Sequence, residues 1–138
     1  MPFVLDASIA ACWGFADENH PIAALALERM RTDAARVPAL WWFELRNTLI
    51  VNERRGRLAE ADTALFLREI SRLPITVDHA PGEAEVLMLA RQHRLTVYDA
   101  SYLELARREG VPLATLDGDL RGAAKAAKVP LLAARAAK

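Results

Sequence analysis

Three aspartates stand where apolar segments of the chain end or where a helix begins. Asp6 follows the apolar run 3–5, Asp117 follows the apolar run 111–116, and Asp99 opens a segment with helical spacing of apolar residues. In open parallel sheets, functional groups gather beyond the carboxyl ends of the strands, beside the point where the strand order reverses. We therefore expect these three carboxylates at one edge of a sheet.

Glu44 is a fourth candidate, although it lies inside a predicted helix. Its neighbours in the sequence, among them Trp41 and Leu45, are mostly apolar. A carboxylate in such surroundings is partly desolvated, and burying it without a partner is costly. Glu44 therefore needs a cation nearby, unless it pairs with Arg36 or Arg46 or stays solvated at the end of the apolar face.

Carboxylates that are brought together repel one another, and a divalent cation removes that repulsion. An all-oxygen set of ligands favours Mg²⁺ or Mn²⁺ over zinc. The three histidines are far apart in the sequence and match no spacing of zinc ligands. The acids therefore predict a magnesium site at Asp6, Glu44, Asp99 and Asp117. Asp119 is an alternative to Asp117, which it follows by two residues.

Each aspartate also has a purely structural interpretation. An Asp at the start of a helix commonly caps it by accepting a hydrogen bond from a backbone N–H of the first turn. This explains Asp6, Asp99 and Asp117 one at a time. It does not explain why three such residues fall on one predicted edge together with a fourth acid that needs a cation, and the sequence leaves both interpretations open.

The elements expected around these acids alternate between strand and helix, which indicates a parallel sheet covered by helices on both faces. The predicted strands are residues 3–5, 36–40, 75–77, 111–116 and 131–132. The predicted helices are residues 8–15, 21–31, 41–55, 60–72, a segment that follows Pro81-Gly82 and ends near His93, 99–109 and 119–128. Residues 95–98 are expected to be extended or irregular, and the alanine-rich tail from residue 133 to fray. We predict one α/β domain over residues 1–138.

Length and composition are those of a soluble globular domain. The chain has 138 residues, 53% of them hydrophobic and 26% charged, with a formal net charge of zero. Any binding to nucleic acid would therefore rely on local basic patches. The single cysteine, Cys12, suits a reducing compartment. Because the start lacks the pattern of a signal peptide and no apolar run approaches the ~18 residues of a membrane helix, we expect a cytoplasmic protein without a membrane partner.

Four segments carry the candidate acids with characteristic neighbours. They are Val4-Leu5-Asp6-Ala7-Ser8, Trp42-Phe43-Glu44-Leu45-Arg46-Asn47-Thr48-Leu49, Tyr98-Asp99-Ala100-Ser101-Tyr102-Leu103-Glu104-Leu105-Ala106 and Gly110-Val111-Pro112-Leu113-Ala114-Thr115-Leu116-Asp117. In this order and at these separations they resemble the motifs of the PIN-domain ribonucleases, and within that family those of the VapC toxins of bacterial toxin–antitoxin pairs. One motif alone is weak, whereas the ordered set spans nearly the whole chain and is specific.

The resemblance implies a three-layer α/β/α domain with a central parallel sheet of about five strands in the order 3-2-1-4-5. It implies an Mg²⁺-dependent endoribonuclease, with Mn²⁺ as a substitute, that cleaves structured RNA such as tRNA or ribosomal RNA by means of metal-activated water. It also implies a homodimer and a cognate VapB-type antitoxin that blocks the site.

The resemblance further assigns roles to individual residues. The acids that would hold the metal and act in catalysis are Asp6, Glu44, Asp99 and Asp117. Ser8, Asn47 and Thr115 occupy small polar positions of the motifs, from which they could orient the carboxylates. Asn47 lies one turn after Glu44 and therefore on the same helix face. Local roles, as a cap, a surface amide and a strand residue, are the alternative explanation for these three residues.

Two basic clusters are candidates for contact with an RNA backbone. One is Arg54, Arg55 and Arg57, and the other is Arg121, Lys125, Lys128, Arg135 and Lys138. Such clusters are more commonly explained as solvated surface residues whose positive charges stabilise the C-terminus of a helix. The pair Trp41-Trp42 fits a core or a dimer interface better than a platform for stacking bases.

Other functions compete with a ribonuclease toxin. A nuclease of the same fold that acts on DNA, or in RNA processing outside a toxin–antitoxin pair, would use the same metal chemistry. A catalytically silent module that binds a partner is a further alternative, against which the complete acidic set argues. A phosphoaspartate hydrolase is disfavoured because Ser8 stands where its second Asp is expected. A receiver domain is disfavoured because Val77-Asp78 and Lys128 match its pattern poorly.

Overall fold

A four-stranded, fully parallel sheet forms the centre of the protein in a computed structural model, which describes residues 1–134. The strand order is β3-β2-β1-β4. The strands are β1 (Phe3–Leu5), β2 (Ala35–Pro38), β3 (Ile75–Asp78) and β4 (Leu113–Ala114). The helices are α1 (Ala7–Cys12), α2 (Pro21–Arg29), α3 (Leu40–Arg54), α4 (Glu60–Ile70), α5 (Glu83–His93), α6 (Val97–Glu109) and α7 (Gly118–Ala126). The predicted α/β class is confirmed.

The order of the strands reverses at β1. The chain passes from β1 outward through β2 to β3 and then returns to the other side of β1 with β4. Val4 accordingly has two parallel partners, Arg36 of β2 and Leu113 of β4. The carboxyl ends of β1 and β4 therefore lie side by side at the switch point, and these are the strands that Asp6 and Asp117 follow.

The predicted fifth strand is reduced to a single bridge between Leu131 and Leu113. The N–H of Leu132 donates to the carbonyl of Leu113 at 2.9 Å, and the N–H of Leu113 donates to the carbonyl of Pro130 at 2.9 Å. Pro130 has no N–H with which to extend this ladder, and β4 itself is two residues long. The described residues therefore form four strands instead of about five, in the expected order 3-2-1-4.

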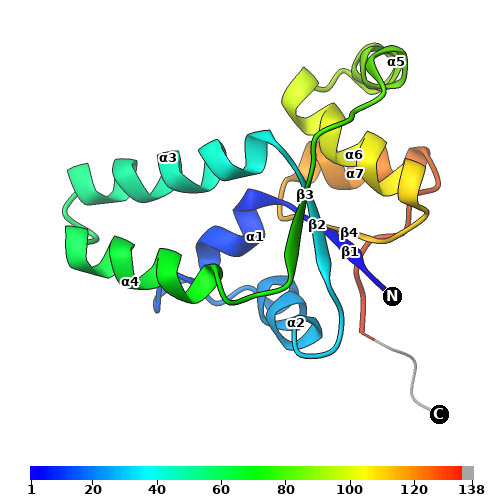
Figure 1. Cartoon of the computed structure of the whole chain (residues 1–138). Coiled ribbons are helices and arrows are strands. Elements are labelled where there is room, and N and C mark those ends of the chain that lie inside the picture. Colours follow the sequence, from blue (N-terminus) through cyan, green and yellow to red (C-terminus); the bar gives the residue numbers. More distant parts are fainter. Residues whose placement is uncertain (135–138) are drawn as a thin grey trace.

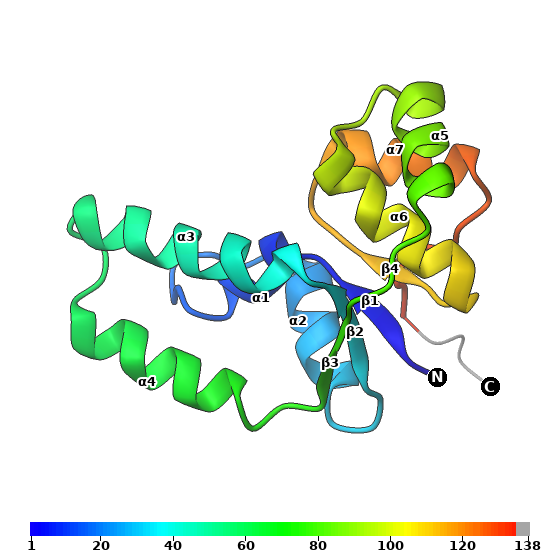
Figure 2. The same ribbon diagram turned by 45° about the horizontal axis from the view of Figure 1, so that its top comes forward.

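Helices cover both faces of the sheet (Figures 1 and 2). α1 and α2 lie on one side and α6 and α7 on the other, with α5 packed against α6. α3 and α4 extend side by side away from the sheet and are joined near Gly56, whose φ of 76° favours glycine. The three-layer arrangement is confirmed. No helix in residues 1–134 combines the length and the apolar character that a membrane crossing requires.

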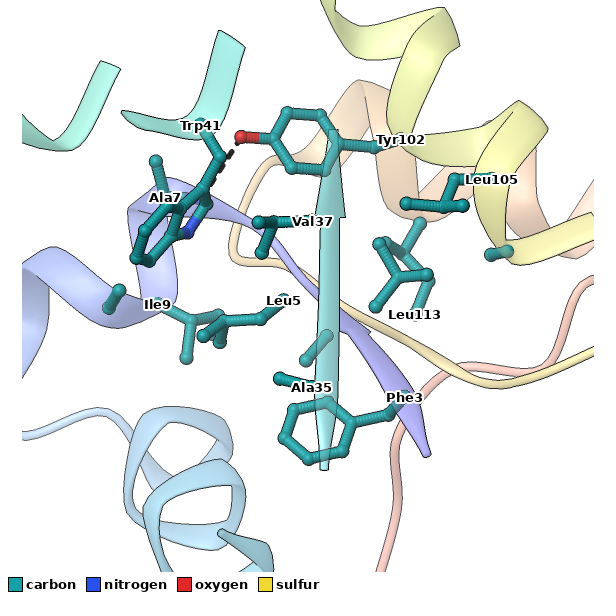
Figure 3. Close-up of a cluster of buried hydrophobic side chains, with 14 of the residues drawn as sticks. Phe3, Leu5, Ala7, Ile9, Ala35, Val37, Trp41, Tyr102, Leu105 and Leu113 are labelled. Carbon is teal, nitrogen blue, oxygen red and sulfur yellow. Dashed lines mark hydrogen bonds between the residues drawn. The ribbon is translucent and has the colours of Figure 1, made fainter. Parts of the chain in front are cut away.

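The core is centred on β1, which is buried on both faces. Phe3, Val4 and Leu5 are each at most 1% exposed, as expected for an inner strand of a parallel sheet. Tyr102 of α6 is the largest of the fully buried side chains. Figure 3 shows its ring within the core and its hydroxyl directed toward the start of α1.

α6 begins at Val97, two residues earlier than predicted. Thr96 is its N-cap, and the Thr96 Oγ1 accepts a hydrogen bond from the N–H of Asp99 at 3.1 Å. The prediction of an extended or irregular segment over 95–98 is therefore wrong for its last two residues, because the threonine caps a helix that includes them. Asp99 lies in the first turn and is not the cap, so its carboxylate is not used by the backbone of α6.

Candidate metal centre

Asp6 is held by two hydroxyl groups where β1 and β4 end. It is 7% exposed, and its Oδ2 accepts hydrogen bonds from Ser8 Oγ at 2.8 Å and from Thr115 Oγ1 at 2.6 Å. The N–H of Leu116 donates to Ser8 Oγ at 3.2 Å. The N–H of Asp117 donates to Thr115 Oγ1 at 3.1 Å. The two hydroxyls therefore fix the Asp6 carboxylate relative to the loop that follows β4.

Glu44, in the first half of α3, is held by α6. The Tyr102 hydroxyl donates to Glu44 Oε1 at 2.5 Å and accepts a hydrogen bond from the N–H of Ala7 at 3.4 Å. Arg36 pairs with a carboxylate of α6, and Arg46 stacks on an aromatic ring of its own helix. The expected alternative of an arginine partner for Glu44 is therefore wrong, because both guanidinium groups are engaged elsewhere.

The remaining acids lie at the N-terminal ends of α6 and α7. Asp117 caps α7, since its Oδ2 accepts a hydrogen bond from the N–H of Leu120 at 2.8 Å. Asp119 lies in the first turn of α7 and is exposed. Within residues 1–134 no group donates a hydrogen bond to the carboxylate of Asp99. None of the acids proposed for the metal takes part in an ion pair with another described residue.

Burial and mutual repulsion raise the pKa of three of these acids. The pKa of Asp6 is raised because burial desolvates its carboxylate, an effect that its hydrogen bonds offset only in part. The pKa of Glu44 is raised mainly by burial and further by the charges of Asp6 and Asp99. For Asp99, burial is again the main cause of the raised pKa, and the charges of Asp117, Asp6 and Asp119 add to it. The acids thus form one electrostatic cluster.

A divalent cation with oxygen ligands fits this cluster. It offers carboxylates without a lysine or arginine partner among the described residues, so a bound cation would offset their repulsion. No three acidic, histidine or cysteine side chains within residues 1–134 already stand in an arrangement that encloses a metal ion. Mg²⁺ usually keeps several waters and is bound directly by one or two carboxylates, so the acids need not all touch it.

Other residues predicted for the site are less closely connected to the acids. Asn47 is exposed, and its side chain forms no hydrogen bond with any of residues 1–134. Arg121 donates to the backbone carbonyl of Thr115 at 3.0 Å, so one member of the C-terminal basic cluster adjoins the Asp6 network. Arg135 and Lys138, two further members of that cluster, and most of the alanine-rich tail lie outside the described residues.

Sequence reasoning missed Tyr102. The available signal was its position three residues after Asp99, which places both side chains on the same face of one helix. The tryptophan pair is divided between two environments, since Trp41 is 4% exposed in the core and Trp42 is 47% exposed at the surface.

The sheet order and the acids at its switch point define the class of this protein. The family model of the PIN domain matches residues 3–126. The chain belongs to the PIN domain family, as its motifs suggested.

Individual relatives narrow the class to VapC proteins. The chain is 32% identical over 123 residues to Ribonuclease VapC3 of Pyrobaculum aerophilum, a match that covers 87% of this chain and 92% of that protein. The crystal structure of PAE2754 from Pyrobaculum aerophilum superposes with a TM-score of 0.70 at 24% identity, over 89% of this chain and 84% of that one. VapC20 of Mycobacterium tuberculosis, a sarcin-ricin loop cleaving toxin, superposes with a TM-score of 0.61 at 19% identity, over 88% and 94%. The sequence match makes the chain a homologue of Ribonuclease VapC3, and the two superpositions show that it shares the fold of PAE2754 and VapC20.

Proposed function

We propose that this chain is a divalent-metal-dependent endoribonuclease toxin. The observation that carries the proposal is a cluster of carboxylates from separate elements that gather at the switch point of the sheet without a basic partner among residues 1–134. Its homology to Ribonuclease VapC3 supports RNA as the substrate.

Within this proposal, Asp6, Glu44 and Asp99 hold Mg²⁺, with Mn²⁺ as a substitute, either directly or through water. These are the acids whose pKa is raised, and a bound cation would favour their ionised forms. Asp117 completes the ligand set with Oδ1, because its Oδ2 already caps α7. Asp119 is the alternative fourth ligand.

In catalysis, the residues of the chain would mainly hold the metal ion and keep the carboxylates in a fixed orientation. When bound, a divalent ion supplies positive charge at the scissile phosphate and lowers the pKa of a nearby water. Ser8 and Thr115 keep the Asp6 carboxylate in one orientation through their hydrogen bonds. Asn47, on the exposed side of α3, is left as a candidate for contact with substrate or with the site. Hydrolysis of this type leaves a 5′ phosphate and a 3′ hydroxyl.

The class of RNA, the partners and the location of the protein are further parts of the proposal. VapC20 is described as a toxin that cleaves the sarcin-ricin loop, which supports a structured RNA of the tRNA or ribosomal class as the target. A cognate VapB-type antitoxin would block the acidic site. The protein would act in the cytoplasm as a homodimer.

The proposal is tested by incubating purified, antitoxin-free protein with bulk structured RNA and, separately, with single- and double-stranded DNA. Discrete RNA fragments that form with Mg²⁺ or Mn²⁺, are absent with EDTA, and have no counterpart in DNA would support a ribonuclease. Cleavage of DNA instead would assign a DNA nuclease of the same fold. A folded protein that cleaves neither polymer would leave a binding module.

A further inference from the structure

Tyr102 carries a hydroxyl group that lies between parts of the acidic cluster. It is on α6, three residues after Asp99, and its ring is fully buried in the core. Its hydroxyl donates to Glu44 Oε1 at 2.5 Å and accepts from the N–H of Ala7 at 3.4 Å. Figure 3 shows this hydroxyl directed toward the start of α1.

This one hydroxyl connects three elements of the site. Glu44 belongs to α3, Ala7 begins α1 directly after Asp6, and Tyr102 belongs to α6. The surrounding core holds the aromatic ring in place, so the hydroxyl is a fixed reference point. A glutamate side chain, in contrast, has several rotatable bonds, and immobilising it costs conformational entropy. Because the fixed donor already orients the Glu44 side chain, less conformational entropy is lost when the carboxylate binds a ligand.

The two carboxylate oxygens of Glu44 differ in their hydrogen bonding. Oε1 accepts the hydrogen bond from Tyr102, whereas Oε2 accepts none from residues 1–134. The carboxylate is therefore held by one oxygen, and the other is left without a donor within the described part of the chain. This is the arrangement expected for a carboxylate ligand that is oriented by a neighbour.

We propose that Tyr102 is a positioning residue that holds the Glu44 carboxylate in place for a divalent cation. This inference rests on the proposed function, because it requires that the acidic cluster binds a metal ion. Hydrogen-bond partners of metal ligands typically change metal affinity or activity about 10–100-fold when they are removed. Tyr102 should contribute at the lower end of that range, because Glu44 is half-buried and water can partly replace the lost donor.

The first test measures Mn²⁺ binding by calorimetry in two matched variants, Tyr102→Phe and Tyr98→Phe. These are the only two tyrosines of the chain, and Tyr98 is 64% exposed with no hydrogen bond from its hydroxyl within residues 1–134. We expect Mn²⁺ to bind about tenfold more weakly to Tyr102→Phe and about as tightly as to wild type in Tyr98→Phe. Equal affinity in both variants would overturn the inference.

A second comparison separates positioning from general structural support. Because Tyr102 acts through Glu44, Tyr102→Phe should cause no further loss of Mn²⁺ affinity in a Glu44→Ala background, in which residue 44 has no acceptor for the tyrosine hydroxyl. A loss of the same size in both backgrounds would mean that the tyrosine affects the site by another route, and would overturn the inference.

A spectroscopic measurement leaves Tyr102 itself unchanged and therefore covers the case in which Tyr102→Phe does not fold. In the Tyr98→Phe protein, Tyr102 is the only tyrosine, and the Raman doublet of its ring reports whether the hydroxyl is a strong hydrogen-bond donor. We expect a strong donor that becomes a weaker one when Glu44→Ala is added. An unchanged doublet would contradict the contact.

The outcomes distinguish this inference from the proposed function. Wild-type protein that binds no Mn²⁺ would refute the metal site and with it the role of Tyr102. Wild-type protein that binds Mn²⁺, together with a Tyr102→Phe variant that binds it equally well, would refute only the role of Tyr102.

Discussion

Replacing Glu44 by glutamine should stabilise the metal-free protein at neutral pH. The carboxylate is half-buried beside other negative charges, and burial is the main reason that its pKa is raised. Glutamine keeps an oxygen that can accept the hydrogen bond of Tyr102 and removes the charge. The position lies well inside α3, where the dipole of the helix terminus has little effect.

The expected gain is modest because Glu44 is partly open to solvent. Single stabilising substitutions, among them those that improve the arrangement of charges, commonly add about 0.5–2 kcal/mol to the free energy of unfolding. Solvent screening of a half-exposed charge favours the lower part of this range, about 0.5–1 kcal/mol. In a chain of 138 residues, this corresponds to a rise in Tm of about 2–3 °C.

The gain should depend on pH in a defined direction. Because the folded-state pKa of Glu44 lies above its ordinary value of 4.5, the folded protein holds this proton more tightly than the unfolded chain does. The favourable contribution of the protonated acid is complete below the unfolded pKa and is lost as pH rises through the folded pKa. The stabilisation by Glu44→Gln should therefore be largest at neutral and alkaline pH and shrink in acid.

Thermal unfolding in EDTA, followed by circular dichroism at about pH 8 and about pH 4.5, measures this effect. Glu69→Gln is the matched control, because Glu69 is exposed on α4 and its carboxylate has no hydrogen bond or ion pair within residues 1–134. The control should change stability by less than about 0.5 kcal/mol. A Glu44→Gln variant that is less stable than wild type at about pH 8, or equally stabilised at both pH values, would contradict this explanation of the raised pKa.

Two further substitutions and the reactivity of one thiol test the core and the support of the site. Thr115→Val should cost about 1–3 kcal/mol of unfolding free energy, because it removes a hydrogen bond to the buried Asp6 and leaves a backbone N–H without its acceptor. Arg108→Met should cost about 2–3 kcal/mol, because Glu104 is 3% exposed and would lose a cation at 2.8 Å. The cost is at the lower end for a buried pair because the Arg108 side chain is 36% exposed. Burial raises the pKa of Cys12 to about 11, so its thiol should react with Ellman's reagent only when the protein unfolds.

Matched controls exist for the two substitutions. Thr76→Val alters an exposed threonine of β3, and Arg107→Met removes an exposed pair with Glu85 at 3.9 Å. Each control should cost less than about 1 kcal/mol. If the controls lose as much unfolding free energy as Thr115→Val and Arg108→Met, the contacts assigned to these two residues are contradicted. Rapid modification of Cys12 in the native protein would contradict its burial.

Much of the fold and the places of its acids within it could be predicted from local sequence. A short apolar run cut off by Asp6 indicates an inner parallel strand, and the alternation of elements places Asp117 at the end of the neighbouring strand. Glu44 could be singled out because an acid among apolar neighbours needs a partner. The motifs around these residues were specific enough to indicate the PIN domain, which the family match confirms.

Features that depend on tertiary contacts could not be predicted in this way. The bond between Tyr102 and Glu44 joins residues that are 58 positions apart, and a tyrosine within an apolar helix face is most simply interpreted as core. Helical periodicity places Asn47 on the face of Glu44 but cannot show that its side chain is exposed and makes no hydrogen bond within residues 1–134. The start of α6 was missed although its cap, Thr96, is a residue type that favours that position.

The most direct test of the central claim is RNA cleavage by wild type, Asp6→Asn and Asp99→Asn, each with Mg²⁺ and with EDTA, alongside the control Glu69→Gln. We predict specific fragments with 5′ phosphate ends for wild type and for the control in Mg²⁺, and none in EDTA. Both aspartate variants should fold and lose at least about 100-fold in rate, as expected when groups that act on the transition state are removed. Full activity in EDTA, or in either aspartate variant, would contradict a metal-dependent acidic site.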